Sequence, residues 1–170
     1  MSNIQEKYQY STPDGRFGIE ILSKEMSTIL KYCSEAKRQE TGGILIGYYT
    51  DGYNMAVITH VSAPPIDSKC STNFFVRGIK GLQRLLNKLW QYKEYYLGEW
   101  HFHPYVAPIP SERDHHQMLT FSCKDTLKCP EPVLLIIGGD PKSVWSAKVI
   151  VYPRGQSALE MIEVGKLTRT

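Results

Sequence analysis

The residues best suited to chemistry are two histidines at alternate positions, His101 and His103, followed by Ser111 and Asp114. Alternate residues of a β-strand share a face, so the two imidazoles can bind one divalent metal ion. Asp114 lies in the first turn of a predicted helix, where the helix dipole favours an ionised carboxylate. Two histidines and one carboxylate leave a fourth tetrahedral position for water, which is typical of a catalytic zinc site.

Each of these signals also has a plainer interpretation. Ser111-x-x-Asp114 is a helix-capping box, and paired histidines are common on surfaces and in packing. The two signals stand close together, however, joined by a proline-rich loop over residues 104–110 that can fold Asp114 back onto the histidines. Capping and metal binding are compatible, because one cap can position both Ser111 and Asp114.

The elements that must position these residues follow from hydrophobic periodicity and turn signals. Strands are predicted over two short runs within residues 8–22 and over residues 42–49, 55–61, 95–103, 133–137 and 144–152, and helices over residues 24–38, 79–90 and 111–122. Strands mixed with helices predict an α/β fold, with helices flanking a mixed β-sheet.

The domain is expected to cover residues 1–152, with residues 153–170 as a C-terminal tail. Ser157-x-x-Glu160 fits a capping box, so a short helix is predicted over residues 157–167. Residues 63–71 contain two adjacent prolines and are expected to form a loop.

Composition and charge exclude several classes of protein. The chain has 170 residues and a net charge of +3, and a chain of this length can bury a core without disulfides. The scattered charges predict no nucleic-acid partner. Four irregularly spaced cysteines, a polar N-terminus and the lack of a long apolar run predict a cytoplasmic protein with no membrane partner.

The motif His101-x-His103-Pro104, followed by Ser111-x-x-Asp114, resembles the signature of the JAMM (MPN+) zinc metalloproteases. That family also requires a glutamate before an upstream strand, and Glu40 stands at this point in the chain. The resemblance covers residues 20–152 and implies a single JAB/MPN domain with one catalytic zinc site. Many members carry Ser or Thr where this chain has Phe102, a position that faces away from the metal.

The resemblance implies a role for each residue. His101, His103 and Asp114 would bind Zn²⁺, which makes hydroxide available near neutral pH. Glu40 would act as general base and then as general acid, and Ser111 would donate a hydrogen bond to the developing oxyanion. The implied reaction is hydrolysis of an amide or isopeptide bond.

Other candidates carry weaker signals. Glu99 shares the strand face of the two histidines and is a rival carboxylate, although a supporting position beside the metal fits it better. His115 and His116 turn away from Asp114 around the helix and are expected on the surface or in packing. Cys123 and Cys129 lack the spacing of a structural zinc site.

JAMM enzymes are associated with ubiquitin-like proteins, which they cleave after a C-terminal glycine. The compact chain resembles bacterial stand-alone members, among them the deconjugating protease of the type II CBASS antiphage system. This implies an isopeptidase acting on a ubiquitin-like protein or conjugated enzyme with a Gly-type C-terminal tail. Residues 104–110 and 63–73 are the expected walls for that tail.

Three alternatives remain open at this point. One is a processing protease for a sulfur-carrier or ubiquitin-like precursor. Another is a non-catalytic, zinc-bearing scaffold, although the chain retains all five motif residues. A third is a RadC-like, DNA-associated protein, against which the scattered charge argues.

Overall fold

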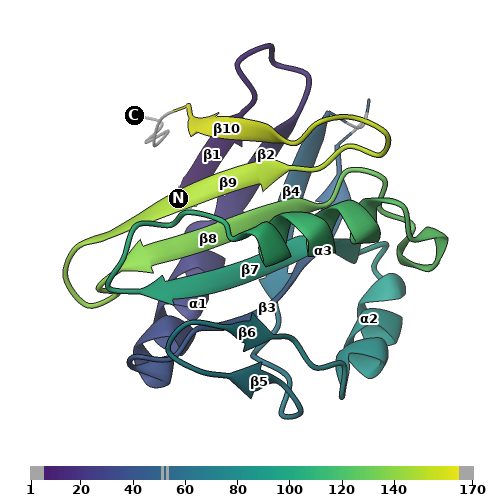
Figure 1. The fold of residues 1–170 in the computed structure, drawn as a ribbon. Helices are drawn as coiled ribbons and strands as arrows, with labels where there is room; N and C mark the ends of the chain where they lie inside the picture. The colour runs from purple at the N-terminus through teal and green to yellow at the C-terminus, as the bar shows by residue number, and fades with distance from the viewer. Residues whose placement is uncertain (1–5, 51, 53, 165–170) are drawn as a thin grey trace, which may run out of the picture.

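The computed structural model describes residues 6–50, 52 and 54–164, and within them eight strands close into a barrel (Figure 1). Around the barrel the strands follow the order β1, β10, β9, β8, β7, β3, β4 and β2, with β2 pairing again with β1. Their bounds are β1 Lys7–Ser11, β2 Gly18–Leu22, β3 Thr41–Tyr49, β4 Met55–Val61, β7 Tyr95–Pro104, β8 Val133–Gly139, β9 Trp145–Val151 and β10 Leu159–Glu163.

The barrel is a mixed sheet, as the sequence predicts. Two neighbouring pairs, β2 with β4 and β7 with β8, run parallel, and the other pairs are antiparallel. Closure of the sheet is a feature that the sequence did not predict. Alternation of apolar residues specifies which face of a strand is buried, but not how strongly the sheet curves or which edge strands meet.

One hydrophobic core fills the barrel and includes a face of α1 (Ser23–Ala36). Every barrel strand contributes to this core, and α1 adds Met26, Ile29 and Cys33. Trp100 and Phe102 of β7 are completely buried there, and the Trp100 ring stacks on Tyr32 with centroids 5.9 Å apart. The inward position of Phe102 confirms that it faces away from the two neighbouring histidines.

Two further helices cover the outer face of the barrel. α2 (Leu82–Trp90) packs on β3 and β7, and α3 (Glu112–Ser122) packs through Met118 on β8 and β9. Figure 1 shows α3 lying across β7 and β8. β8 is therefore buried on both faces, which explains its uninterrupted apolar run at residues 133–137. A single 3₁₀ turn, η1 (Asp125–Leu127), follows α3.

The helix predicted over residues 157–167 is wrong where the structure describes it. Residues 159–163 form strand β10, which pairs with β9 on one side and β1 on the other; residues 165–167 lie outside the described part. The Met161 side chain enters the barrel core. Burial of this side chain and two open strand edges outweigh the local capping signal, because the barrel supplies hydrogen-bond partners for the whole segment.

Residues 63–71, predicted as a loop, contain one arm of a small hairpin. β5 (Lys69–Cys70) pairs with β6 (Phe75–Val76), and this two-stranded sheet stands apart from the barrel. Two-residue strands leave too little periodicity to be recognised in a sequence. None of the helices in the described ranges is long and apolar enough to cross a membrane.

Met161→Ala tests whether β10 belongs to the barrel. Met161 is 4% exposed and Ile162, on the other face of the strand, is 57% exposed. We expect Met161→Ala to lower the free energy of unfolding by about 2–5 kcal/mol, because it leaves a cavity in the core. The control Ile162→Ala changes it by less than about 1 kcal/mol. Chemical denaturation measures both values, and equal small losses would mean that β10 does not close the barrel.

Candidate active site

A bulge in β7 sets which residues of this strand face outward. Leu45 of β3 is opposite Gly98 and Ile46 is opposite Tyr96, so Leu97 is an extra residue on β7. A Cβ atom on Gly98 would collide with the Val133 carbonyl group, so only glycine fits there.

Beyond the bulge the strand alternates regularly. Trp100 and Phe102 enter the core, which leaves Glu99, His101 and His103 on the outer face beside α3. The regular part of β7 therefore presents both histidines on one face, as the sequence predicts.

His101, His103 and Asp114 form a cluster with the geometry of a metal site. One ligand atom from each residue lies within 4.8 Å of the others, and all three side chains are buried. His101 Nδ1 lies 2.9 Å from Asp114 Oδ1, and His103 Nε2 lies 3.8 Å from Asp114 Oδ2. His101 Nε2 is buried without a hydrogen-bond partner in the described part of the chain. A buried imidazole nitrogen without a partner, on a ring whose other nitrogen contacts a carboxylate, fits a metal-binding histidine.

Asp114 reaches the histidines because it caps α3. Its Oδ2 accepts hydrogen bonds from the Ser111 backbone N–H at 2.7 Å and from Ser111 Oγ at 2.8 Å. The Asp114 backbone N–H donates to Ser111 Oγ at 3.2 Å, which completes the capping box. The capping interpretation and the metal interpretation of this motif are therefore compatible in the structure.

The pKa shifts of Asp114 and His103 favour the protonation states that metal ligands need. Burial alone would raise the pKa of Asp114, but His101 and the hydrogen bonds from Ser111 hold that pKa well below its usual range. Burial and the neighbouring His101 lower the pKa of His103, and the attraction of Asp114 only partly opposes this. An ionised carboxylate and a neutral imidazole are the ligand forms that bind a metal ion.

Glu40 lies next to the cluster, at the entry to β3. Gly42 of β3 pairs with His101 across the sheet, so Glu40, two residues earlier, shares the outer face of the two histidines. Burial and the nearby Asp114 carboxylate raise the pKa of Glu40, and His101 opposes the rise. A Cβ atom on Gly42 would press on the His101 ring, so this glycine leaves room beside the cluster.

Glu99 is part of a different contact. It is 0% exposed, and its carboxylate accepts a hydrogen bond of 2.6 Å from Arg77 Nε and one of 2.9 Å from Tyr96 Oη. Burial raises the pKa of Glu99, and the charge of Arg77 opposes this shift. Both carboxylate oxygens are engaged, which leaves Glu99 a supporting position two residues before His101.

Arg77 and Phe75 are site residues that sequence reasoning missed. Arg77 follows β6, and its contact with Glu99 fastens the β5–β6 hairpin to β7. Phe75 of the same hairpin packs edge-on against the His101 ring, with centroids 5.4 Å apart. No spacing rule links these positions, so no sequence signal could have identified either residue.

The remaining candidates have structural positions. His115 packs beside Tyr152, whose Oη lies 2.8 Å from His115 Nδ1, and His116 is exposed. All four cysteines are free, with Cys123 exposed and Cys129 buried. Within the described ranges, His101, His103 and Asp114 form the only group of three or more side chains that could bind one metal ion.

Comparison with known proteins identifies the family to which this chain belongs. Residues 23–149 match the family described as prokaryotic homologs of the JAB domain, and the chain belongs to this family. The protein is a JAMM-type hydrolase, and its family implies a metal ion at the active site.

Three curated relatives are similar over much of the chain. A protein of Enterobacter hormaechei, named CD-NTase/cGAS isopeptidase, is 37% identical over 91% of this chain and 86% of its own length. A protein of Escherichia coli with the same name is 35% identical over 65% of this chain and 68% of its own. A protein of Sinorhizobium fredii, named probable metalloprotease y4qB, is 26% identical over 69% of this chain and 74% of its own length.

The fold also occurs in a solved structure. The solution structure of protein DSY2949 from Desulfitobacterium hafniense matches with a TM-score of 0.61 and 18% identity, over 84% of this chain and 87% of that one. This likeness concerns the fold alone.

His103→Ala tests the metal site. Removal of one of three protein ligands is expected to weaken binding of a divalent metal ion by more than about 100-fold. The matched control is His116→Ala, which changes an exposed histidine of α3. Metal content of the purified proteins and competition with a chromophoric chelator measure the effect. Wild-type affinity in His103→Ala would contradict this ligand set.

Arg77→Met tests the contact that holds the hairpin. The Glu99 and Arg77 side chains are 0% and 9% exposed, so loss of the cation leaves a buried, uncompensated carboxylate. We expect the free energy of unfolding to fall by about 3–5 kcal/mol. Adding Glu99→Leu to Arg77→Met should restore most of the lost free energy of unfolding, because no charge then stays buried.

Lys148→Met is the matched control for Arg77→Met. Lys148 pairs with the largely exposed Glu160 at 3.0 Å, and loss of such a pair costs less than about 1 kcal/mol. Denaturation curves compare all the variants. A cost for Arg77→Met no larger than that of Lys148→Met would show that the buried pair does not fasten the hairpin.

Proposed function

We propose that this protein is a zinc-dependent isopeptidase that cleaves after the C-terminal glycine of a ubiquitin-like protein or conjugated enzyme, in a bacterial antiphage system. The observation that carries the proposal is the 37% identity, over 91% of this chain, with a protein named CD-NTase/cGAS isopeptidase. The His101, His103 and Asp114 cluster, with Glu40 beside it, supports hydrolytic chemistry at the centre of the matched region.

Zinc suits the proposed ligands. Imidazole nitrogens and carboxylate oxygens are both ligands that Zn²⁺ takes in proteins, and three protein ligands leave a position free for water or substrate. Zn²⁺ held there would polarise the substrate carbonyl group and lower the pKa of a bound water. The buried Phe75 ring against His101, and the capping box that fixes Asp114, hold the ligands in place before the ion binds.

Glu40 is the proposed proton carrier. It takes a proton from the attacking water and returns it to the leaving amine. Burial and the Asp114 charge raise its pKa, which brings the carboxylate closer to the pH at which a proton can be both accepted and released. Its position just before β3, beside the histidines of β7, suits this exchange.

Ser111 is proposed to stabilise the oxyanion of the transition state. Its hydroxyl group now donates to Asp114 Oδ2 at 2.8 Å and accepts from the Asp114 backbone N–H. The hydroxyl hydrogen of Ser111 rotates about the C–O bond, so the hydroxyl group can stop donating to Asp114 and donate to a substrate oxygen instead. The hydrogen bond from the Ser111 backbone N–H keeps Asp114 in place meanwhile.

The proposed path for the substrate tail lies between two segments. Residues 104–110 carry the exposed side chains of Tyr105, Val106 and Ile109 on one side, and the β5–β6 hairpin stands on the other. The His101 side chain is buried, so a substrate segment can approach it closely only if its own side chains are small. This favours glycine at the scissile bond. The four free cysteines agree with a reducing compartment such as the cytoplasm.

Glu40→Gln tests the proposal. The amide keeps the shape of the carboxylate but cannot accept a proton, so kcat is expected to fall by at least about 100-fold, with metal content and substrate affinity unchanged. The substrate is a glycine-terminated ubiquitin-fold protein joined by an isopeptide bond to a lysine of a reporter protein. Cleavage is followed on gels, with o-phenanthroline as the metal-removal arm.

The matched control for Glu40→Gln is Glu35→Gln, which makes the same change at an exposed position of α1. It should cleave at the wild-type rate. Equal cleavage by Glu40→Gln and the wild type would remove Glu40 from the mechanism. Cleavage of linear glycine fusions but of no isopeptide conjugate would favour precursor processing over deconjugation.

A further inference from the structure

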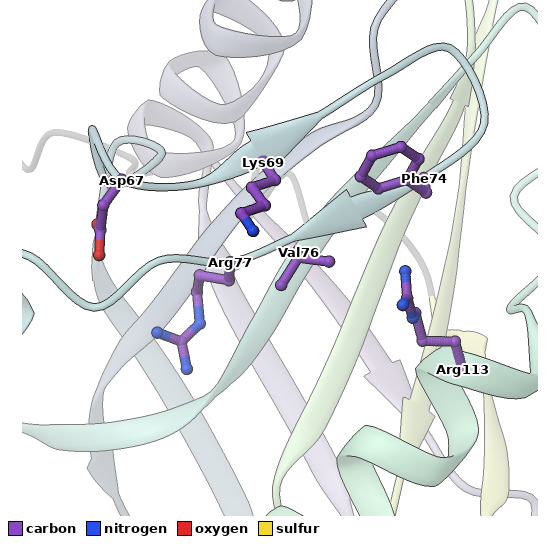
Figure 2. A pocket seen from close by; sticks show the side chains of 6 residues that line it. All are labelled: Asp67, Lys69, Phe74, Val76, Arg77 and Arg113. Atoms are coloured by element: carbon purple, nitrogen blue, oxygen red, sulfur yellow. The ribbon is translucent and has the colours of Figure 1, made fainter.

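A pocket beside the metal cluster carries an unbalanced positive charge. The pocket lies between the β5–β6 hairpin and the start of α3 (Figure 2). The residues that line it are Asp67, Lys69, Phe74, Val76, Arg77 and Arg113. Three of these six side chains are cationic, and one is acidic.

The pocket adjoins the reactive centre on two sides. Arg113 directly precedes Asp114 on α3. On the hairpin, Phe74 and Val76 face the pocket, whereas Phe75 between them packs on the His101 ring. The pocket therefore lies directly beside the metal cluster, within reach of a protein substrate that is bound there.

Two of the charges are already compensated within the protein. The Arg77 guanidinium is bound to the buried Glu99 carboxylate. Asp67 accepts hydrogen bonds from the backbone N–H groups of Ile79 and Lys80, at 3.1 and 3.0 Å. Neither side chain is free to bind a charged ligand, and both hold the hairpin in its position.

The other two cations, Lys69 and Arg113, are exposed and form no ion pair with any residue of the described ranges. Figure 2 shows Arg113 extending from α3 toward Phe74, on the side of the pocket opposite Asp67. Glu112 precedes Arg113 on the helix but turns about 100° away and does not line the pocket. Arg113 also stands in the first turn of α3, where the helix dipole disfavours a cation and favours an anion.

We propose that this pocket, with Lys69 and Arg113 at its rim and Phe74 and Val76 as an apolar wall, binds an acidic side chain of the protein substrate close to the scissile bond. A carboxylate can accept hydrogen bonds from the Arg113 guanidinium and from the Lys69 ammonium group. The methylene groups of an Asp or Glu side chain lie against the apolar wall. The inference rests on the proposed function and adds to it a charge preference, which neither the metal ligands nor Glu40 can supply.

The experiment varies the charge of the substrate and the charge of the pocket independently. The probes are internally quenched peptides with glycine on the amino side of the scissile bond and either Asp or Asn at the positions flanking the glycine segment. The proteins are the zinc-loaded wild type, Lys69→Gln/Arg113→Gln, and the control Arg84→Gln, which removes an exposed cation of α2 outside this pocket.

The wild type is expected to prefer the Asp peptide by about three- to tenfold in kcat/KM, mainly through KM, because two exposed ion pairs each contribute modestly. The double variant should lose this preference, so that its kcat/KM values for the Asp and Asn peptides become equal, while Arg84→Gln should behave as the wild type. The preference should shrink as salt is raised. Equal rates on the two peptides, or a preference that survives in the double variant, would overturn the inference.

Binding separates this inference from the proposed function. Fluorescence anisotropy of the same peptides, without the quencher, on zinc-loaded Glu40→Gln needs no hydrolysis. If the wild type cleaves neither peptide but Glu40→Gln binds the Asp peptide more tightly through Lys69 and Arg113, the pocket is supported and the proposed reaction is not. If the peptides are cleaved with no charge dependence, the reaction stands and the pocket assignment fails.

Discussion

The carboxylate of Asp114 connects the first turn of α3 to the histidines of β7. Its Oδ2 caps α3 through Ser111, and its Oδ1 lies 2.9 Å from His101 on β7. The helix therefore cannot move away from the strand without losing either its cap or the buried contact between Asp114 and His101. Because Met118 packs the same helix on β8, the position of this carboxylate is fixed by the core as well as by polar contacts.

The barrel makes such a buried polar cluster tolerable. Three ionisable side chains are buried on its outer face, and only a rigid surface can keep their partners close enough to offset desolvation. β7 lies between β3 and β8, so its backbone is held on both sides. The bulge near Gly98 then decides that Glu99, His101 and His103 face α3 while Trp100 and Phe102 fill the interior.

The hairpin is attached to this surface by one buried ion pair and one aromatic contact. Arg77 binds Glu99, two residues before His101, and Phe75 packs on the His101 ring. The same short segment therefore packs on a candidate metal ligand from one side and borders the charged pocket on the other. The candidate metal site and the proposed binding pocket therefore share supporting contacts, and a change in the hairpin is expected to affect both.

Local spacing in the sequence was enough to predict the residues of the candidate site and most of the elements that carry them. The spacing of His101, His103, Ser111 and Asp114 is local, and local spacing fixes which side chains share a strand face or a helix turn. The central strands and the three helices were predicted for the same reason, and their ends differ from the structure by a few residues.

Other features depend on contacts between distant parts of the chain, and no local pattern predicts them. The tertiary structure closed the sheet into a barrel, turned residues 159–163 from a predicted helix into β10, and paired Arg77 with Glu99. Each of these outcomes is set by partners far away in the sequence, namely the free edges of β1 and β9 and a carboxylate that burial leaves in need of a cation. Local propensity contains no information about such partners, and their contribution to the free energy exceeds the local preference that they override.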